Sequence, residues 1–218
     1  MKVAEQPFSF MTASYLTCVS KMRVSTLAGL RDGLKDSSDA SIFNHTFQSL
    51  GRYHFLTEGF SNDFAQWVLA SCNRAELAEA LAALDIREYL QLAELRTDLR
   101  HVVTEFCEAH PKLAEQQAFE PFYFCESIEV TVPLGGEVRT LEDFRQGLEH
   151  LSHDSFHYHF LAARLRLHLR TNDFSYWFEN GLGLPKLAQR TNRIDVYTNT
   201  LESAKARLLS LVDQELAS

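Results

Sequence analysis

The chain repeats itself at an offset of 114 residues, and this duplication constrains its fold more than any other feature of the sequence. Residues 7–52 and 121–166 are identical at 14 of 46 aligned positions, whereas average composition gives about three by chance. After a four-residue deletion the offset becomes 110, which aligns the Asn-Asp-Phe-x-x-Trp motif at 62–67 with the same motif at 172–177. The sequence therefore predicts two structurally related halves.

Each half has the pattern of several amphipathic helices. Apolar residues recur at three- and four-residue spacings after Thr26 and Thr140, which we interpret as helix N-caps, and Gly and Pro are scarce. We predict an all-α protein built from two helical repeats, residues 1–110 and 122–218, with a linker at 111–121. The long apolar stripes need cover, so we expect the repeats to pack as one globular unit about a pseudo-twofold axis.

Two aromatic segments fit helices less well. Residues from Phe122 to Val132 alternate between apolar and polar like a strand, and residues from Phe8 to Leu16 do so less clearly. We interpret both as short extended segments within the all-α fold. The second helix of the first repeat is expected to run from about Ser38 to Leu56.

The two tryptophans fall in register with each other. Trp67 lies three residues after Phe64, and Trp177 lies three residues after Phe174, so each pair shares one helix face. We expect both indoles to be buried core residues, the alternative being a stacking surface for sugar rings.

Composition and charge exclude several classes of partner. A net charge of −8 disfavours binding to nucleic acid or to an anionic membrane. The longest stretch without Asp, Glu, Lys or Arg, from Gln6 to Ser20, is too short and too polar to span a bilayer. We see no signal peptide and expect a cytoplasmic protein. The four cysteines are far apart and lack metal-ligand spacing, which predicts reduced, buried thiols.

Several polar residues recur in both halves, although core packing alone does not require them. In each half a His and an Arg seven residues apart share a helix face, and an Asn-Asp pair begins the next helix, where its carboxylate can reach either partner. We favour buried hydrogen-bond networks that hold the helices together. The residues concerned are His45, Arg52, Asn62 and Asp63, with their counterparts His159, Arg166, Asn172 and Asp173.

Three functional interpretations of these and neighbouring residues stay open. The His and Arg side chains of both repeats could hold a small anion such as a phosphorylated metabolite. Ser41 and His45, or their second-repeat counterparts, could form a nucleophile pair, although no nucleophile-elbow motif surrounds either serine. His150, His153 and His157 share one stripe if their helix is continuous, which suits Zn or Ni, but capping residues between them argue against continuity. We predict no metal site and no cofactor, since the chain contains no phosphate-binding glycine motif.

The combined motifs resemble those of a known family. Each half contains an F-x-F segment, a Thr-Leu helix start, a Ser-[Ile/Phe]-x-x-His motif and an Asn-Asp-Phe-x-x-Trp motif. From Phe8 to Leu211 the chain is similar to a bacterial and archaeal family, the domain of unknown function 5752. The family has no assigned reaction, so the resemblance implies no activity.

No recognisable catalytic set accompanies the duplicated polar residues. We therefore predict a non-enzymatic binding, regulatory or accessory protein. A second copy of the chain, a protein partner and a small anionic ligand are the candidate partners. The alternative is an enzyme or sensor for a small anionic or sugar-like metabolite that uses His, Arg and Asp from both repeats.

Overall fold

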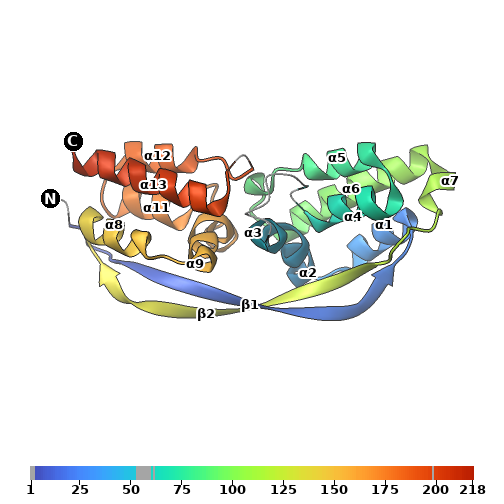
Figure 1. Ribbon diagram of the computed structural model, residues 1–218, viewed down its shortest axis with the longest axis horizontal. Helices are drawn as coiled ribbons and strands as arrows, with labels where there is room; N and C mark the ends of the chain where they lie inside the picture. The colour runs from blue at the N-terminus through green and yellow to red at the C-terminus, as the bar shows by residue number, and fades with distance from the viewer. Residues whose placement is uncertain (1–2, 53–59, 61, 198) are drawn as a thin grey trace. The chain divides into compact units, whose positions relative to one another are not determined.

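The computed structural model describes residues 3–52, 60, 62–197 and 199–218. Its elements succeed one another in a similar order in the two halves of the chain (Figure 1). By their contacts, the described residues divide into two compact units. The α1–α7 unit contains residues 15–52, 60 and 62–128, and the α8–α13 unit contains residues 3–14, 129–197 and 199–218. The repeat boundaries expected from the sequence remain a prediction.

The helical elements of the two units correspond closely. The α1–α7 unit contains α1 (Leu27–Asp36), α2 (Asp39–Phe43), the π-helical η1 (Asn44–Gln48), α3 (Ser49–Arg52), α4 (Asp63–Cys72), α5 (Ala75–Ala82), the 3-10 turn η2 (Ile86–Glu88), α6 (Leu92–Ala109) and α7 (Pro111–Ala114). The α8–α13 unit contains α8 (Leu141–Glu149), α9 (His153–His157), the π-helical η3 (Tyr158–Ala162), α10 (Ala163–Leu167), α11 (Asp173–Asn180), α12 (Pro185–Asn192) and α13 (Leu201–Leu216).

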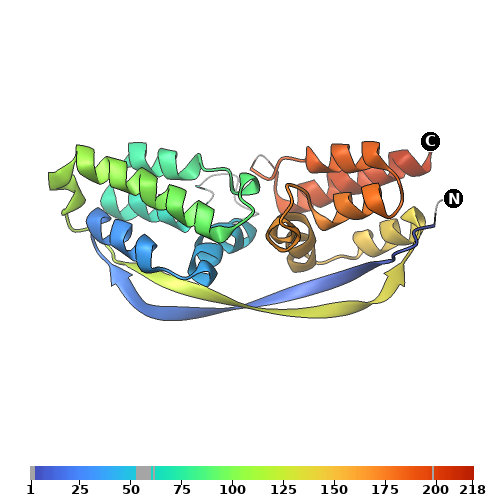
Figure 2. The same ribbon diagram turned by 180° about the vertical axis from the view of Figure 1, so that it is seen from behind.

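The fold is mixed α and β, so the prediction of an all-α protein is wrong. Strands β1 (Phe8–Val24) and β2 (Phe122–Val138) form a two-stranded antiparallel sheet, visible from both sides in Figure 1 and Figure 2. Helices account for 59% of the residues and strands for 16%. The alternation of apolar and polar residues identified the first part of each strand. Its partner strand comes from the opposite half of the chain, which no local pattern can reveal.

Each strand contributes to both compact units. The part of β1 up to Ser14 belongs to the α8–α13 unit and the rest to the α1–α7 unit, while β2 changes from the α1–α7 unit to the α8–α13 unit after Ile128. The aromatic start of β1 therefore packs on helices of the second half. The ring centroid of Phe8 lies 5.4 Å from that of Phe144 and 5.6 Å from that of Trp177.

The start of β2 makes the reciprocal contacts in the α1–α7 unit. The ring centroid of Phe122 lies 5.2 Å from that of Phe64 and 5.7 Å from that of Trp67. Both tryptophans are buried, as expected from the sequence. Each unit thus completes its aromatic core with a strand segment from the other half of the sequence.

The buried side of each strand changes partway along its length. In β1, Phe8 and Phe10 are buried and the next buried residue is Ala13, and β2 shows the same change after Phe124. Alternate residues of a regular strand face the same side, so this change requires a local irregularity. At this point the backbone N–H of Met11 donates to a side chain, and the N–H of Cys125 does the same in β2.

The N-caps predicted from the sequence are confirmed. The side chains of Thr26, Thr140, Asn62 and Asn172 each accept a hydrogen bond from the backbone N–H three residues further on. The capping residue has an extended backbone in all four cases, as N-caps normally do. These residues fix where α1, α4, α8 and α11 begin.

The helix expected from Ser38 to Leu56 is not a continuous α-helix. It is divided into α2, η1 and α3, and α9, η3 and α10 follow the same succession in the other unit. A π-helical segment widens the helix locally and changes the direction of the side chains that follow it. Such segments often occur at functional sites. The expected end at Leu56 lies outside the described residues.

Two glycines that are identical in the repeats allow a strand aromatic ring to approach a helix. A Cβ atom built on Gly147 of α8 would lie 2.2 Å from Cε2 of Phe10, and one built on Gly33 of α1 would lie 2.6 Å from Cε2 of Phe124. Both rings are buried, so they have little room to move. Each glycine is therefore explained by the close approach of a strand.

We expect Gly147→Ala to lower the free energy of unfolding by about 1–3 kcal/mol through overpacking. Without the clash, the better helix propensity of Ala would raise it by about 1 kcal/mol. Denaturant unfolding followed by circular dichroism measures the change. Combining Gly147→Ala with Phe10→Leu should recover part of the loss, and an unfolding free energy at or above the wild-type value in the single variant would contradict the packing explanation.

Candidate functional site

In the α1–α7 unit, Asp63 at the start of α4 is the centre of a partly buried polar network. Its Oδ2 atom lies 2.8 Å from Nδ1 of His45 and accepts a 3.0 Å hydrogen bond from Nη2 of Arg52. Its Oδ1 atom accepts a 2.7 Å hydrogen bond from the hydroxyl of Ser49. Nη2 of Arg52 also donates to the carbonyl oxygen of Asn44 at 3.2 Å. Both carboxylate oxygens are thus occupied.

The α8–α13 unit contains an equivalent network around Asp173. Its Oδ2 atom lies 2.7 Å from Nδ1 of His159 and 2.5 Å from Nη2 of Arg166. Nη1 of Arg166 donates to the carbonyl oxygen of Tyr158 at 3.3 Å, and the guanidinium carbon lies 3.7 Å from the centroid of the Tyr158 ring. This is a cation–π contact, which further fixes the arginine.

The strand backbone determines the tautomer of both histidines. Nε2 of His45 accepts a 2.8 Å hydrogen bond from the N–H of Cys125, and Nε2 of His159 accepts one of the same length from the N–H of Met11. A backbone amide can only donate, so Nε2 carries no proton and Nδ1 donates its proton to the aspartate. Each imidazole is therefore neutral with both nitrogens occupied, and the Asp and Arg charges balance.

The structure brings His, Arg and Asp together in each unit. The two asparagines instead cap the helices that carry the aspartates. Asn62 and Asn172 cap their helices, and their side-chain NH₂ groups tie the cap to a neighbouring helix. Nδ2 of Asn62 donates to the carbonyl oxygen of Leu81 at 3.1 Å, and Nδ2 of Asn172 donates to Oδ1 of Asn192 at 2.9 Å. The asparagines thus fix the position of the adjacent aspartates.

Sequence reasoning missed three contributors to the networks. The strand N–H groups were missed because a backbone donor leaves no side-chain pattern. Ser49 was missed because Ala163 stands at the equivalent position of the second repeat, so the residue is not duplicated. Tyr158 was missed for the same reason, since its counterpart is Asn44. In both units the carbonyl at this position nevertheless accepts from the arginine.

Neither predicted Ser–His pair forms a hydrogen bond between its two side chains. The buried hydroxyl of Ser41 has no partner within the described part of the chain, while both nitrogens of His45 bond elsewhere. The hydroxyl of Ser155 lies 2.9 Å from that of Ser152. An activated serine needs a base within hydrogen-bond reach, so this geometry gives no support to a serine nucleophile.

The cysteines also differ from expectation, since only Cys107 is buried while Cys18 is exposed on β1 and the other two are partly buried. The backbone N–H of Cys125 donates a hydrogen bond to His45. Burial raises the pKa of the Cys125 thiol above its ordinary value, which Arg52 offsets only in part. A thiol with a raised pKa is a poor nucleophile at neutral pH.

The histidines considered as metal ligands do not lie on one helix. Helix α8 ends at Glu149 and α9 begins at His153, with Ser152 as its N-cap, so His150 lies outside both helices. Nε2 of His153 lies 2.6 Å from a carboxylate oxygen of Glu202. In the ranges that the structure describes, no group of three His, Cys, Asp or Glu side chains is arranged to hold a metal ion. The spacing argument failed because the helix is interrupted.

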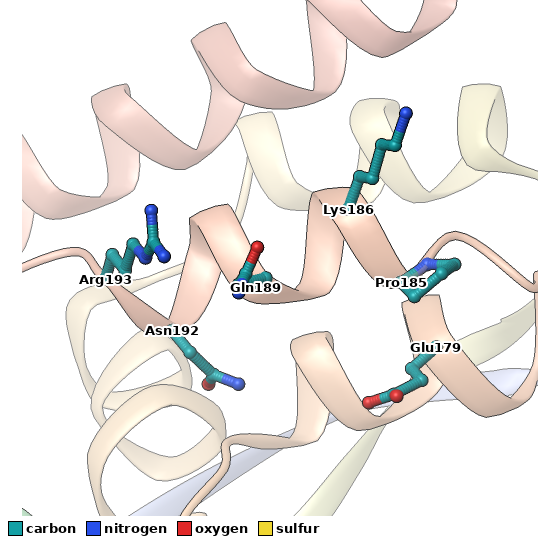
Figure 3. Close-up of a pocket in the computed structure, with 6 residues that line it drawn as sticks. All are labelled: Glu179, Pro185, Lys186, Gln189, Asn192 and Arg193. Atoms are coloured by element: carbon teal, nitrogen blue, oxygen red, sulfur yellow. The ribbon is translucent and has the colours of Figure 1, made fainter.

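A surface pocket of about 520 Å³ lies along α11 and α12 (Figure 3), and Asn192 in its lining accepts the hydrogen bond from Asn172, the residue before Asp173. Its lining includes the cationic side chains of Lys186 and Arg193 and the carboxylate of Glu179. In Figure 3, Lys186 and Glu179 point in opposite directions, so the charged groups do not converge on one point. We therefore do not place an anion site there. Among the described residues, no helix has the length and apolar character needed to cross a membrane.

Two comparisons relate the chain to known proteins. A family model described as a family of unknown function, DUF5752, matches residues 5–213. A solved structure described as the structure of OrfY from Thermoproteus tenax is similar with a TM-score of 0.84 and 27% sequence identity, covering 99% of this chain and 98% of that chain. No curated protein matches the chain. Neither description mentions a ligand or a reaction.

Proposed function

Because the chain belongs to the family of unknown function DUF5752, its role has to be inferred from its own residues, and we propose that it is a non-enzymatic binding protein of the regulatory or accessory kind. In this proposal the two His–Asp–Arg networks are structural: each attaches one strand to the helices of its unit. The protein then acts through its surface, by binding a partner, and not through chemistry at these residues.

The observation that carries the proposal is the full use of both histidines. A general base needs a free lone pair, and a general acid needs a proton that it can release to substrate. In His45 the lone pair of Nε2 is used by the strand N–H and the proton of Nδ1 is used by Asp63. His159 is bonded in the same way to Met11 and Asp173. Catalysis by either imidazole would require the strand to lose its hydrogen bond.

One observation favours the alternative of a sensor for a small anionic metabolite. The side chains of Arg52 and Arg166 are 36% and 33% exposed, so each guanidinium could offer N–H groups to an anion while keeping its bond to aspartate. An anion bound there would lie beside the networks and change the electronic environment of the imidazoles. The binding-protein proposal and the sensor alternative therefore predict different NMR signals for the two imidazoles.

Histidine NMR tests the proposal directly. A long-range ¹H–¹⁵N spectrum distinguishes a protonated ring nitrogen from a bare one, and we expect both His45 and His159 to show a proton on Nδ1 at neutral pH. Addition of inorganic phosphate, glucose 6-phosphate or AMP should leave their Nε2 signals and the Tm unchanged. The exposed His101 serves as the control for weak, non-specific binding.

The opposite result would favour a sensor or an enzyme. It would be a saturable shift of either Nε2 signal together with a rise in Tm, because a ligand that binds only the folded state stabilises it by mass action. Arg52→Lys or Arg166→Lys should then abolish both effects, since Lys lacks the planar donor geometry of Arg.

A further inference from the structure

Both strands carry exposed apolar side chains. On β2, Val130, Val132 and Leu134 are 48%, 49% and 51% exposed, and they share one face of the strand because alternate residues point to the same side. On β1, Val19 is 69% exposed and shares its face with Lys21 and Arg23, whereas Leu16, which is 58% exposed, lies on the opposite face. Apolar side chains gathered in this way, next to charged residues, are typical of protein interaction surfaces.

The charged residues beside these apolar side chains have opposite signs on the two strands. Residues 15–24 of β1, the basic segment, contain Lys21 and Arg23 and no acidic residue. Residues 129–138 of β2, the acidic segment, contain Glu129 and Glu137 and no basic residue. The basic segment belongs to the α1–α7 unit and the acidic segment to the α8–α13 unit.

One pair of these opposite charges stands at equivalent positions of the duplication. Arg23 and Glu137 are related by the same offset of 114 residues that aligns the identical residues of the two halves. Buried aromatic positions of the strands are identical in the two halves, since Phe8 and Phe10 correspond to Phe122 and Phe124. The divergence to opposite charge is therefore confined to a surface that the core does not constrain.

These charges are largely unused within the chain. In the part of the protein that the structure describes, Lys21, Arg23 and Glu129 form no ion pair, and Glu137 approaches Arg139 only at 3.7 Å, with both side chains exposed. An exposed pair of this kind contributes little to stability. In the basic segment the two cations share a strand face with exposed Val19. In the acidic segment Glu129 lies on the face opposite Val130, Val132 and Leu134, and both faces are exposed there.

We propose that the occupant of this surface is a second copy of the chain, with the basic segment of one copy bound to the acidic segment of the other. The surface that complements a cationic apolar segment is an anionic apolar segment of similar length, and every copy carries one. In a closed dimer the same contact is made twice, which is the commonest symmetry of homo-oligomers. The inference goes beyond the proposed function, because it would hold whether or not a metabolite binds.

Charge reversal tests this proposal. Light scattering across a dilution series at low salt should give twice the 24.9 kDa chain mass for the wild type at high concentration. Arg23→Glu or Glu137→Arg alone should each weaken self-association by about tenfold or more, because like charges then face each other twice. The chain that carries both substitutions should dimerise again, since positions 23 and 137 have exchanged their charges and are complementary once more.

Mixing the two single variants provides a second, independent readout. Arg23→Glu chains carry a carboxylate at both positions 23 and 137, and Glu137→Arg chains carry a guanidinium at both. An equimolar mixture should therefore form heterodimers although neither variant dimerises well alone. Arg100→Glu on α6 and Glu79→Arg on α5 are matched controls on exposed helix faces and should associate like the wild type. Far-UV circular dichroism confirms that every variant is folded.

Three results would each overturn the proposal. The first is a mass of one chain for the wild type at every concentration. The second is a dimer whose strength is the same in the wild type and in both single variants, because the contact would then lie elsewhere. The third is continuous growth beyond the dimer with rising concentration, which would indicate an open assembly and not a closed pair.

Discussion

Replacing Trp177 by Ala is expected to lower the free energy of unfolding by about 3–5 kcal/mol, a large fraction of a typical total of about 5–15 kcal/mol. The indole is buried and its ring is stacked on Phe144, with ring centroids 5.4 Å apart. It also contacts Phe8 of β1, and Nε1 donates to the carbonyl oxygen of Gln6 at 3.0 Å. The substitution therefore removes the side chain that holds the start of β1 on the helices.

Denaturant unfolding followed by circular dichroism measures this loss. The chain has two tryptophans, so in this variant the fluorescence of Trp67 reports separately on the α1–α7 unit. Trp177→Phe is the matched control, because it keeps an aromatic ring in the core and loses the N–H group, and a smaller cost is expected. Near-native stability of the Ala variant would contradict a core role and favour the alternative of a stacking surface for sugar rings.

Replacing Asp63 by Ala is expected to lower the free energy of unfolding by about 2–3 kcal/mol, because buried His45 loses its acceptor while the guanidinium of Arg52 is partly exposed to water. Removing one partner of a partly buried network leaves the others without a compensating group, and here His45, Arg52 and Ser49 all lose an acceptor. Ser49→Ala removes one hydrogen bond from the same carboxylate and should cost about 1 kcal/mol. Comparing Asp63→Ala with Ser49→Ala separates the effect of removing the carboxylate charge from the effect of removing one hydrogen bond to it.

Asp32→Ala is the control for the loss of a carboxylate as such. Asp32 pairs with Arg31 on the exposed surface of α1, so its removal should change the unfolding free energy by no more than about 0.5 kcal/mol. A functional site kept at a cost to stability would behave in the opposite way. An Asp63→Ala variant as stable as the wild type, or more stable, would therefore argue against the structural role that we assign to the network.

The local elements were predictable because their signals are local. Thr26 and Asn62 cap helices by accepting a hydrogen bond from the backbone N–H three positions further on, so both partners lie within one short stretch of sequence. The pairing of β1 with β2 was not predictable in this way. Each strand alternates partly like a strand, but its partner lies in the opposite half of the chain, and a scarcity of Gly and Pro favoured helices throughout.

The side chains of the candidate site were predictable from the sequence, but their hydrogen bonds to the strand backbone were not. Duplicated polar residues drew attention to His45, Arg52 and Asp63, and these three do meet. The bond from the N–H of Cys125 to His45, which decides the tautomer and with it the functional interpretation, depends on where β2 changes its buried side. That irregularity and the π-helical segment η1 both depend on tertiary packing, which a single sequence does not specify.

The reciprocal exchange of strand segments has a consequence for the history of the chain. A polypeptide with only one of the two repeats would carry a strand whose aromatic start fits helices of the other repeat, and its own helices would lack a partner for Phe64 and Trp67. Two such polypeptides could complete each other by swapping strands, the arrangement known from domain-swapped dimers. Gene fusion would then have joined the swapped partners. Once covalently linked, each half would be free to change its surface without losing the other, and the opposite charges of Arg23 and Glu137 at equivalent positions fit that freedom.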